Sequence, residues 1–306
     1  MKKKDLLIVG ITILISILIF LNKDLVINTV FEALNIWINN LVPTLWPFFI
    51  IASILISYNA GYYLTKIFPF FKNLFNINDS SLLVFFLSIF SGFPSNARNT
   101  RILYDNGYIS DKEASKLLTF THFSNPLFIL GVLGLFFNNK NIGPIIMICH
   151  YLPNILIGII FRNYSSVSEN NKIDKKKELS FGKILINSVT SSIDSLLLIL
   201  GILTIFLIVS SLILKYLPNN IYISCLVKSI LEITIGLKEL SILAIPLKVK
   251  IILTSMILSF GGISVHLQVS SQISGTKIKY LPFLIARIIH SGLSLILGIL
   301  YFSFST

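Results

Sequence analysis

An anion-binding pattern is found in the segment 89–100, which reads IFSGFPSNARNT. Gly92 permits a turn, and Pro94 lacks an N–H group and disfavours helix at the residue before it. A helix that restarts near Ser95 directs its free N–H groups, and about half a positive charge, back towards the break. The segment therefore predicts a broken helix whose second half begins at a site suited to an anion.

Two cations and an amide follow this break. Arg98 and Arg101 are spaced i, i+3, so they share one face of the restarted helix, and Asn96 lies in its first turn. In this interpretation the two arginines strengthen the preference for a negatively charged ligand. The alternative is that both side chains extend to a cytoplasmic membrane surface and anchor the helix there.

The stretch GGISVHLQ has related features in the second half of the chain. Gly261 and Gly262 permit a flexible hinge, and Ser264, His266 and Gln268 alternate with apolar residues. We expect His266 and Gln268 to face a cavity. Close helix packing, which glycine also allows in membranes, is the competing interpretation of the glycine pair.

Ionisable side chains also occur inside apolar stretches. A charge at the centre of a membrane costs at least about 2.5–3.5 kcal/mol, so Glu232 and Arg287 are expected to face protein or water and to serve function. For Glu232 a position at the membrane interface is the alternative. His150 and His290 are single histidines on apolar spans, for which packing or helix–helix hydrogen bonds are the expected role.

The composition indicates a polytopic membrane protein. Of the 306 residues, 54% are hydrophobic and only 12% are charged, and the mean hydropathy is +0.84. The net charge of +12 comes from cations in loops between apolar runs, which favours contact with the bilayer surface over nucleic acid. No phosphate-binding loop, H-E-x-x-H or G-x-S-x-G motif is present, so we expect no enzyme, catalytic residue, metal site or cofactor.

Six apolar stretches are predicted to cross the membrane. They are Leu6–Leu21, Leu41–Leu64, Asn125–Phe137, Ile142–Phe161, Asp194–Leu214 and Leu281–Phe304. Between them, Val26–Asn40 is expected to be an interfacial helix, Leu82–Phe120 a re-entrant hairpin, Ile221–Ile235 a weaker apolar segment, and Ile251–Phe260 a short run before the glycine pair. No cleavage site follows the first span, so it is expected to remain, with the N-terminus in the cytoplasm.

The order of these parts predicts an inverted repeat. The basic stretch 162–183 is placed in the cytoplasm by the positive-inside rule, and an even number of crossings before it requires the hairpin. The expected units are a span at 1–24, a first repeat at 25–161, the basic linker at 162–183 and a second repeat at 184–306. The predicted fold class is therefore an all-α polytopic protein with about six spans and two re-entrant broken helices.

Five motifs in this order resemble the sporulation integral membrane protein YlbJ (SpoVV) family, within the group that carries the nucleoside-transporter/FeoB-GTPase Gate domain. They are PTLWPFFI from Pro43, SGFPSNAR from Ser91, PLFILG from Pro126, LEITIG from Leu231 and FGGISVHLQ from Phe260. The resemblance covers roughly residues 25–304.

The chain departs from the family pattern at polar positions. Phe93, Asn96 and Arg98 stand where the pattern has Tyr, Gly and Lys. The family's Asn-Asn-x-Ser-Pro is replaced by a run from His122 to Pro126, in which Asn125 is the polar residue expected at the site. The scaffold is therefore kept while residues suited to contact a substrate differ.

The resemblance implies a role in spore formation. Its expected activity is movement of dipicolinate, a small aromatic dianion, across the mother-cell-derived membrane around the forespore. The partners that the resemblance implies are the bilayer and the anionic substrate. A second copy of the chain and other sporulation membrane proteins are both open as protein partners. The alternative is a membrane scaffold that transports nothing; in that case both breaks are packed dry and Arg98 faces lipid headgroups.

Overall fold

The computed structural model describes residues 3–165 and 180–304, and this part of the chain contains helices and no strand. The elements are α1 (Lys3–Leu21), α2 (Lys23–Ile36), η1 (Trp37–Leu41), α3 (Val42–Ser57), α4 (Gly61–Ile67), α5 (Pro69–Phe75), α6 (Asp79–Ser91), α7 (Ser95–Asp105), α8 (Asp111–Phe120), η2 (Phe128–Val132), α9 (Leu133–Phe136), α10 (Ile142–Ile160), α11 (Phe181–Lys215), α12 (Ile221–Leu231), α13 (Ile233–Ile242), α14 (Leu247–Phe260), α15 (Gly262–Gln272) and α16 (Leu281–Phe304).

Five of the helices are long and apolar enough to cross a membrane, or six if the bent pair α5–α6 counts as one span. This confirms the prediction of an all-α polytopic protein with about six spans. Two of the stretches predicted to cross are corrected: Leu6–Leu21 lies in a shorter apolar helix, and Asn125–Phe137 contains only the short elements η2 and α9. Apolar side chains also cover much of the outer surface, such as Phe20 at 83% exposure, as expected where hydrocarbon replaces water. The basic linker lies largely in 166–179, outside the described residues.

A continuous span of 35 residues, Lys23–Ser57, joins α2 to α3 through the π-helical turn η1. This corrects the prediction of a separate interfacial helix at Val26–Asn40. The indole of Trp37 donates a hydrogen bond to the carbonyl of Leu196, at 2.9 Å, and Ala33 is fully buried. This segment therefore packs against α11 instead of lying flat at the membrane interface.

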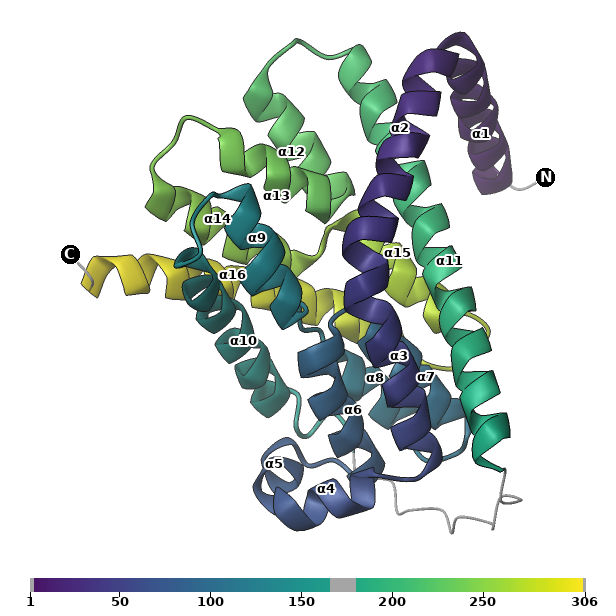
Figure 1. Ribbon diagram of the computed structural model, residues 1–306. Helices are drawn as coiled ribbons and strands as arrows, with labels where there is room; N and C mark the ends of the chain where they lie inside the picture. Colours follow the sequence, from purple (N-terminus) through teal and green to yellow (C-terminus); the bar gives the residue numbers. More distant parts are fainter. Residues whose placement is uncertain (1–2, 166–179, 305–306) are drawn as a thin grey trace.

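The helix α11, also 35 residues long, runs antiparallel to α2–α3 along its whole length (Figure 1). It begins at Phe181, well before the predicted start at Asp194 and slightly before the predicted repeat boundary at 184. Each long helix is followed by a pair of short ones: α4–α5 lies at the bottom of Figure 1, and α12–α13 lies at the top.

The pair α12–α13 replaces the weak segment predicted at Ile221–Ile235. Glu232 adopts an extended backbone between the two helices and ends the first of them. The helices then pack so closely that a Cβ added at Gly236 would lie 2.4 Å from the Cα of Ser229. With 11 and 10 residues, neither helix reaches the length of about 20 residues needed to cross.

Each half then contains a helix interrupted by glycine. In the first half α6 ends at Gly92 and α7 begins at Ser95, as predicted. In the second half Gly261 is both the C-cap residue of α14 and the N-cap residue of α15. Because this break takes a single residue, α14 and α15 together form one 26-residue candidate span, Leu247–Gln272, which corrects the prediction of a re-entrant segment there.

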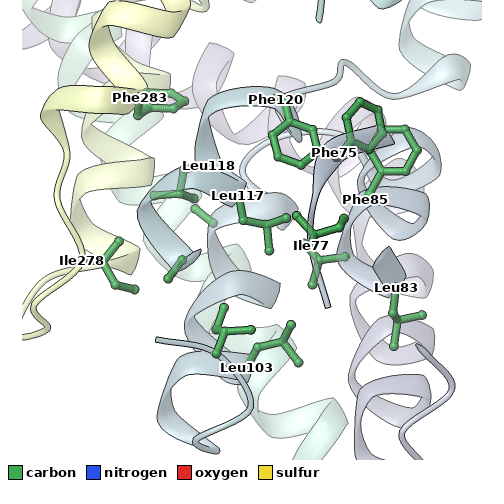
Figure 2. Close-up of a cluster of buried hydrophobic side chains, with 14 of the residues drawn as sticks. Phe75, Ile77, Leu83, Phe85, Leu103, Leu117, Leu118, Phe120, Ile278 and Phe283 are labelled. Atoms are coloured by element: carbon green, nitrogen blue, oxygen red, sulfur yellow. The ribbon is translucent and has the colours of Figure 1, made fainter. Parts of the chain in front are cut away.

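The largest core cluster fixes the first break against the C-terminal helix α16. The rings of Phe75 and Phe120 lie 4.8 Å apart, and those of Phe75 and Phe85 lie 4.9 Å apart (Figure 2). Phe283 of α16 belongs to the same buried cluster. The helix α8 within it begins with a capping contact that its sequence Ser110-Asp-Lys-Glu113 favours, in which Ser110 accepts a hydrogen bond from the Glu113 amide at 3.2 Å.

Candidate functional site at the helix breaks

The first break packs against the loop 121–127 that follows α8. The amide of Phe93 donates to the carbonyl of Phe123 at 2.8 Å, and the Phe93–Pro94 peptide is cis. Gly92 has a φ of +70°, and a Cβ there would lie 2.6 Å from the Asn125 nitrogen. Only glycine meets both the conformational and the steric condition, so the break and the loop form one unit.

The second break packs against the turn between α12 and α13. Gly261 and Gly262 have φ values of +97° and +68°. A Cβ at Gly262 would lie 3.4 Å from the carbonyl oxygen of Ile230 and 3.5 Å from the amide nitrogen of Ile233. The glycine pair therefore lies beside Glu232 and the start of α13.

His122 lies between these two breaks. Its ring stacks on Phe93 with centroids 4.6 Å apart and planes 9° apart, and it meets the edge of Phe283 at 5.1 Å. A Cβ at Gly261 would lie 3.2 Å from its Nε2 atom. From the sequence, His122 was named only as the first residue of a replaced family motif and not as a site residue. The single signal was its place in the loop motif, where the family pattern has Asn.

Several buried polar atoms of α7, of α15 and of the loop after α8 have no hydrogen-bond partner among the described residues. They are both ring nitrogens of His122, the side-chain oxygens of Asn96, Asn99 and Thr100 on α7, and the hydroxyl of Ser264 on α15. An unsatisfied buried polar group costs about 1–3 kcal/mol, so each of these atoms is a candidate for contact with a ligand. The hydroxyls of Ser165 and Thr254 and the Nε atom of Arg287 are buried without a partner as well. Asn99 and Thr100 were missed from the sequence because neither forms part of a recognised motif.

A small cavity of about 50 Å³ lies where the first break, the loop and α13 meet. Its lining combines apolar side chains with four polar residues, Thr44, Ser124, Asn125 and Thr234. Of the predicted residues, Asn125 is therefore at the cavity; its amide group donates to the Thr44 carbonyl and accepts from the Leu127 amide. A water molecule occupies roughly 30 Å³ in the liquid, so this cavity is too small for an aromatic dicarboxylate.

Arg98 extends away from the cavity and joins α7 to both long helices. Its guanidinium donates to the hydroxyls of Ser53 at 2.9 Å, Ser191 at 2.7 Å and Ser195 at 3.0 Å. It also lies over the ring of Phe49 at 5.3 Å and is only 4% exposed. The side chain therefore does not reach a headgroup region, and its donors are directed at the protein.

Arg101 is separated from Arg98 and is held near the end of α15. It forms an ion pair with Asp105 at 2.6 Å and donates to the carbonyls of Gln272 at 3.1 Å and Ser274 at 2.7 Å. The Gln272 carbonyl is among those that the end of α15 leaves unpaired, and Ser274 lies just beyond that end. The contacts give Arg101 a structural task, the joining of α7 to the end of α15.

The remaining predicted residues lie in the first turns of the restarted helices or beside them. Ser95 accepts from the Ser91 hydroxyl at 2.7 Å. The Glu232 carboxylate is buried and caps α13 by accepting from the Ile235 amide at 3.0 Å. His266 contacts the Tyr280 hydroxyl at 2.6 Å, and Gln268 is buried one turn further along α15.

Arg287 is fully buried on α16 and has only neutral partners among the described residues. It contacts the His290 ring at 2.6 Å and donates to the Thr119 carbonyl at 2.5 Å and the Asn154 side chain at 3.0 Å. Ion pairs elsewhere in the described residues include Lys72–Asp79, Arg101–Asp105 and Lys228–Glu239. Arg98 and Arg287 are thus buried cations without a carboxylate partner in that part of the chain.

Metal binding finds no support in the described residues. They contain no group of three or more His, Cys, Asp or Glu side chains arranged to hold an ion, and Cys149 and Cys225 are both free and buried. The arrangement offers a buried, polar centre near the ends of helices.

A comparison with characterised proteins identifies a relative. The chain is 31% identical over 297 residues to the sporulation integral membrane protein YlbJ of Bacillus subtilis (strain 168), and the match covers 84% of this chain and 72% of that protein. No family model matches the chain, so the Gate-domain grouping stays a prediction. No solved structure matches it.

Proposed function

The chain belongs to the family of the sporulation integral membrane protein YlbJ and is a multi-pass membrane protein, and from this premise we propose that it carries a small organic anion across a membrane during sporulation. Dipicolinate is the substrate that the resemblance implies. The membrane around the forespore is the location we propose with it.

The observation that carries the proposal is the convergence of two restarted helices on a buried polar centre. Asn96 in the first turn of α7 and Ser264 in the first turn of α15 have unpartnered polar atoms, and His122 lies between the two breaks. Broken helices persist in hydrocarbon only when protein or a cavity satisfies their free backbone groups. Transporters place their substrate sites at such interruptions, with helix N-termini directed at anionic groups.

The balance of buried charge favours an anion over a cation. Arg98 and Arg287 are buried cations whose partners in the described residues are neutral. The buried carboxylate of Glu232 is already engaged in capping α13. A negatively charged ligand would therefore be attracted to this centre, whereas a cationic one would be repelled.

Access to the centre requires a change of conformation. The cavity lined by Phe93 and by the start of α13 measures only about 50 Å³ and has no room for such a substrate. We propose that the α6–α8 region moves relative to the long helices α2–α3 and α11. Arg98 of α7 is the contact between the two parts, because it donates to Ser53 of α3 and Ser191 of α11. Such a motion is the usual consequence of an inverted-repeat transporter plan.

The scaffold alternative is less well supported. It predicts that Arg98 faces lipid headgroups, but Arg98 is 4% exposed and hydrogen bonded between the helices. It also predicts dry, fully packed breaks, whereas unpartnered polar atoms are concentrated there. Both observations support transport.

The test is uptake of labelled dipicolinate into vesicles that contain the purified protein, with protein-free vesicles as the reference. The matched variants are Ser264→Ala and Thr100→Val, which remove unpartnered hydroxyls, and Ser16→Ala, which changes an exposed serine on α1. We expect the first two to lower uptake about two- to tenfold, the range of one lost hydrogen bond, without lowering thermal stability. Ser16→Ala should transport normally.

The absence of uptake above protein-free vesicles, for dipicolinate and for other small dicarboxylates, would contradict the proposal. So would normal uptake by both Ser264→Ala and Thr100→Val, because the polar centre would then have no part in transport.

A further inference from the structure

All four histidines of the chain gather around one face of α16. His122 meets the ring of Phe283 at 5.1 Å, and His266 meets the same ring at 5.2 Å. One turn along, Arg287 contacts His290, whose ring stacks on that of His150 at 4.8 Å. These four rings come from the loop 121–127 and from α10, α15 and α16, elements far apart in the sequence.

Two of these rings are held in a neutral form by their partners. The Nε2 atom of His150 accepts from the Ser124 amide at 2.9 Å, so its proton lies on Nδ1, which faces the hydroxyl of Ser259 at 2.8 Å. The Nδ1 atom of His290 faces a guanidinium donor of Arg287, so its proton lies on Nε2 and is donated to the His150 carbonyl at 2.7 Å.

The same reasoning applies to His266. Its Nε2 atom faces the carbonyl of Phe260 at 3.0 Å and must donate, which leaves Nδ1 to accept from the Tyr280 hydroxyl at 2.6 Å. Three of the four imidazoles therefore have both nitrogens satisfied in the neutral form.

His122 differs because neither of its nitrogens has a partner among the described residues, although the side chain is fully buried. The charged and titratable groups that face it are Arg287 and His290 from α16, His266 from α15 and His150 from α10. All of these are basic. The positive charge of Arg287 opposes a second positive charge on His122 until an anion is present to offset it.

We propose that His122 binds a carboxylate of the transported anion and takes up a proton as it does so. This inference rests on the proposed function and adds to it a substrate ligand and a proton that accompanies the substrate. A neutral imidazole offers one donor, whereas an imidazolium offers two and a charge, so the bound anion stabilises the protonated ring.

The stacking of His122 on Phe93 ties this event to the first break. The two rings are nearly parallel, and Phe93 also lines the cavity at the break. An aromatic carboxylate that enters by displacing Phe93 would meet the same imidazole face with its own ring. Because binding and protonation are linked, each must increase the affinity for the other by the same factor.

The experiment measures dipicolinate binding to the full-length protein in lipid nanodiscs between about pH 5.5 and pH 8, a range that lies above the titration of carboxylic acids and spans that of imidazole. We expect the dissociation constant to fall as pH falls, by up to about tenfold per pH unit, for one linked proton. Calorimetry in buffers of different ionisation enthalpy should show that up to one proton is taken up per dipicolinate bound, with the largest uptake at the pH where the dissociation constant changes most steeply with pH.

The variant His122→Gln keeps hydrogen-bonding capacity but cannot be protonated. We expect its affinity to be weaker at low pH and to be independent of pH, with no proton uptake. His266→Gln is the control, since that ring already has two partners, and it should retain the pH slope of the parent. Size-exclusion profiles and thermal unfolding establish that both variants are folded.

Two failures can be told apart. If the parent protein binds no dipicolinate at any pH, the proposed substrate is wrong and this inference fails with it. If the parent binds dipicolinate without a pH slope or proton uptake, or if folded His122→Gln keeps the slope, the inference is overturned while anion transport stands. The proton measurement on the parent decides the matter even if His122→Gln does not fold.

Discussion

At the scale of single residues, the two buried arginines have separate tasks. Arg98 connects α7 to α3 and α11 through hydroxyl groups, and Arg287 connects α16 to α8 and α10 through a carbonyl and an amide. Neither guanidinium lines the small cavity at the first break. Their positive charge acts on the centre from a distance, while the contacts nearest to the breaks are made by neutral polar groups.

Removing Arg98 should therefore affect stability. Arg98→Gln loses most of the hydrogen bonds to Ser53, Ser191 and Ser195, and with roughly 0.6 kcal/mol for each interhelical bond in a membrane protein we expect unfolding to become easier by about 2 kcal/mol. Arg98→Lys should recover only part, since a point charge replaces a planar fork. Thermal unfolding in detergent measures both.

The same variants distinguish a residue that connects helices from a residue that binds the substrate. A ligand role predicts a KM for dicarboxylate uptake that rises well before stability falls, as expected from the sequence alone. For Arg98→Gln we expect stability to fall before the KM for dicarboxylate uptake rises. Arg101→Gln serves as the control, because its contacts lie at the end of α15, and it should shift stability less.

At the scale of elements, glycine at the second break determines how α15 starts. Gly262 has a φ of +68°, and the space around its Cα allows a Cβ in ordinary contact with the turn at Ile230. Glycine is thus favoured at position 262 by the positive φ of the backbone more than by a lack of space for a side chain. At Gly92 in the first break both constraints apply, because the Asn125 backbone occupies the place of a Cβ.

We predict that Gly262→Val abolishes uptake while the protein still inserts, because a β-branched residue is strained at positive φ and its methyl groups would press on the turn before α13. The matched control is Gly275→Val. Gly275 has a φ of +73° but no neighbouring atom within 4 Å, so it carries the same backbone strain away from the site. Uptake normalised to membrane abundance should remain for Gly275→Val, and equal loss in both variants would mean that strain alone is responsible.

At the scale of the whole molecule, the two halves have matching elements in opposite orientation. The 35-residue span α2–α3 runs antiparallel to the 35-residue α11, and the short pairs that follow them lie at opposite ends (Figure 1). A glycine-interrupted helix comes next in each half. The inverted repeat itself stays a prediction, and the transport mechanism that we propose rests on it.

Topology can be measured directly. Cysteines introduced near Asn139, in the turn before α10, and near Lys176, in the basic linker, should be labelled from opposite sides, with the linker accessible from the cytoplasm. The 19 residues of α10 separate the turn from the start of the linker. Labelling of both cysteines from one side would contradict the inverted arrangement. A parent protein in which Cys149 and Cys225 are replaced provides the background.

The amino-acid sequence by itself determined the class of protein, most of the helices and the position of each break. Apolar runs of spanning length, the glycines at 92 and 261, and Pro94 are local properties, and their effects follow from backbone conformation and from the cost of burying polar groups in hydrocarbon. The start of α8 was predictable for the same reason, since Ser110 and Glu113 form a cap within one turn.

Only the tertiary structure decided which polar residues meet. The direction of Arg98 towards serines of α3 and α11, and the position of His122 between the two breaks, depend on elements that are far apart in the chain. The path of Val26–Asn40 was likewise decided by packing on α11, because Trp37 finds its acceptor there. Burial and hydrogen-bond partners depend on which helices pack together. The spacing of residues along the sequence does not show which helices those are.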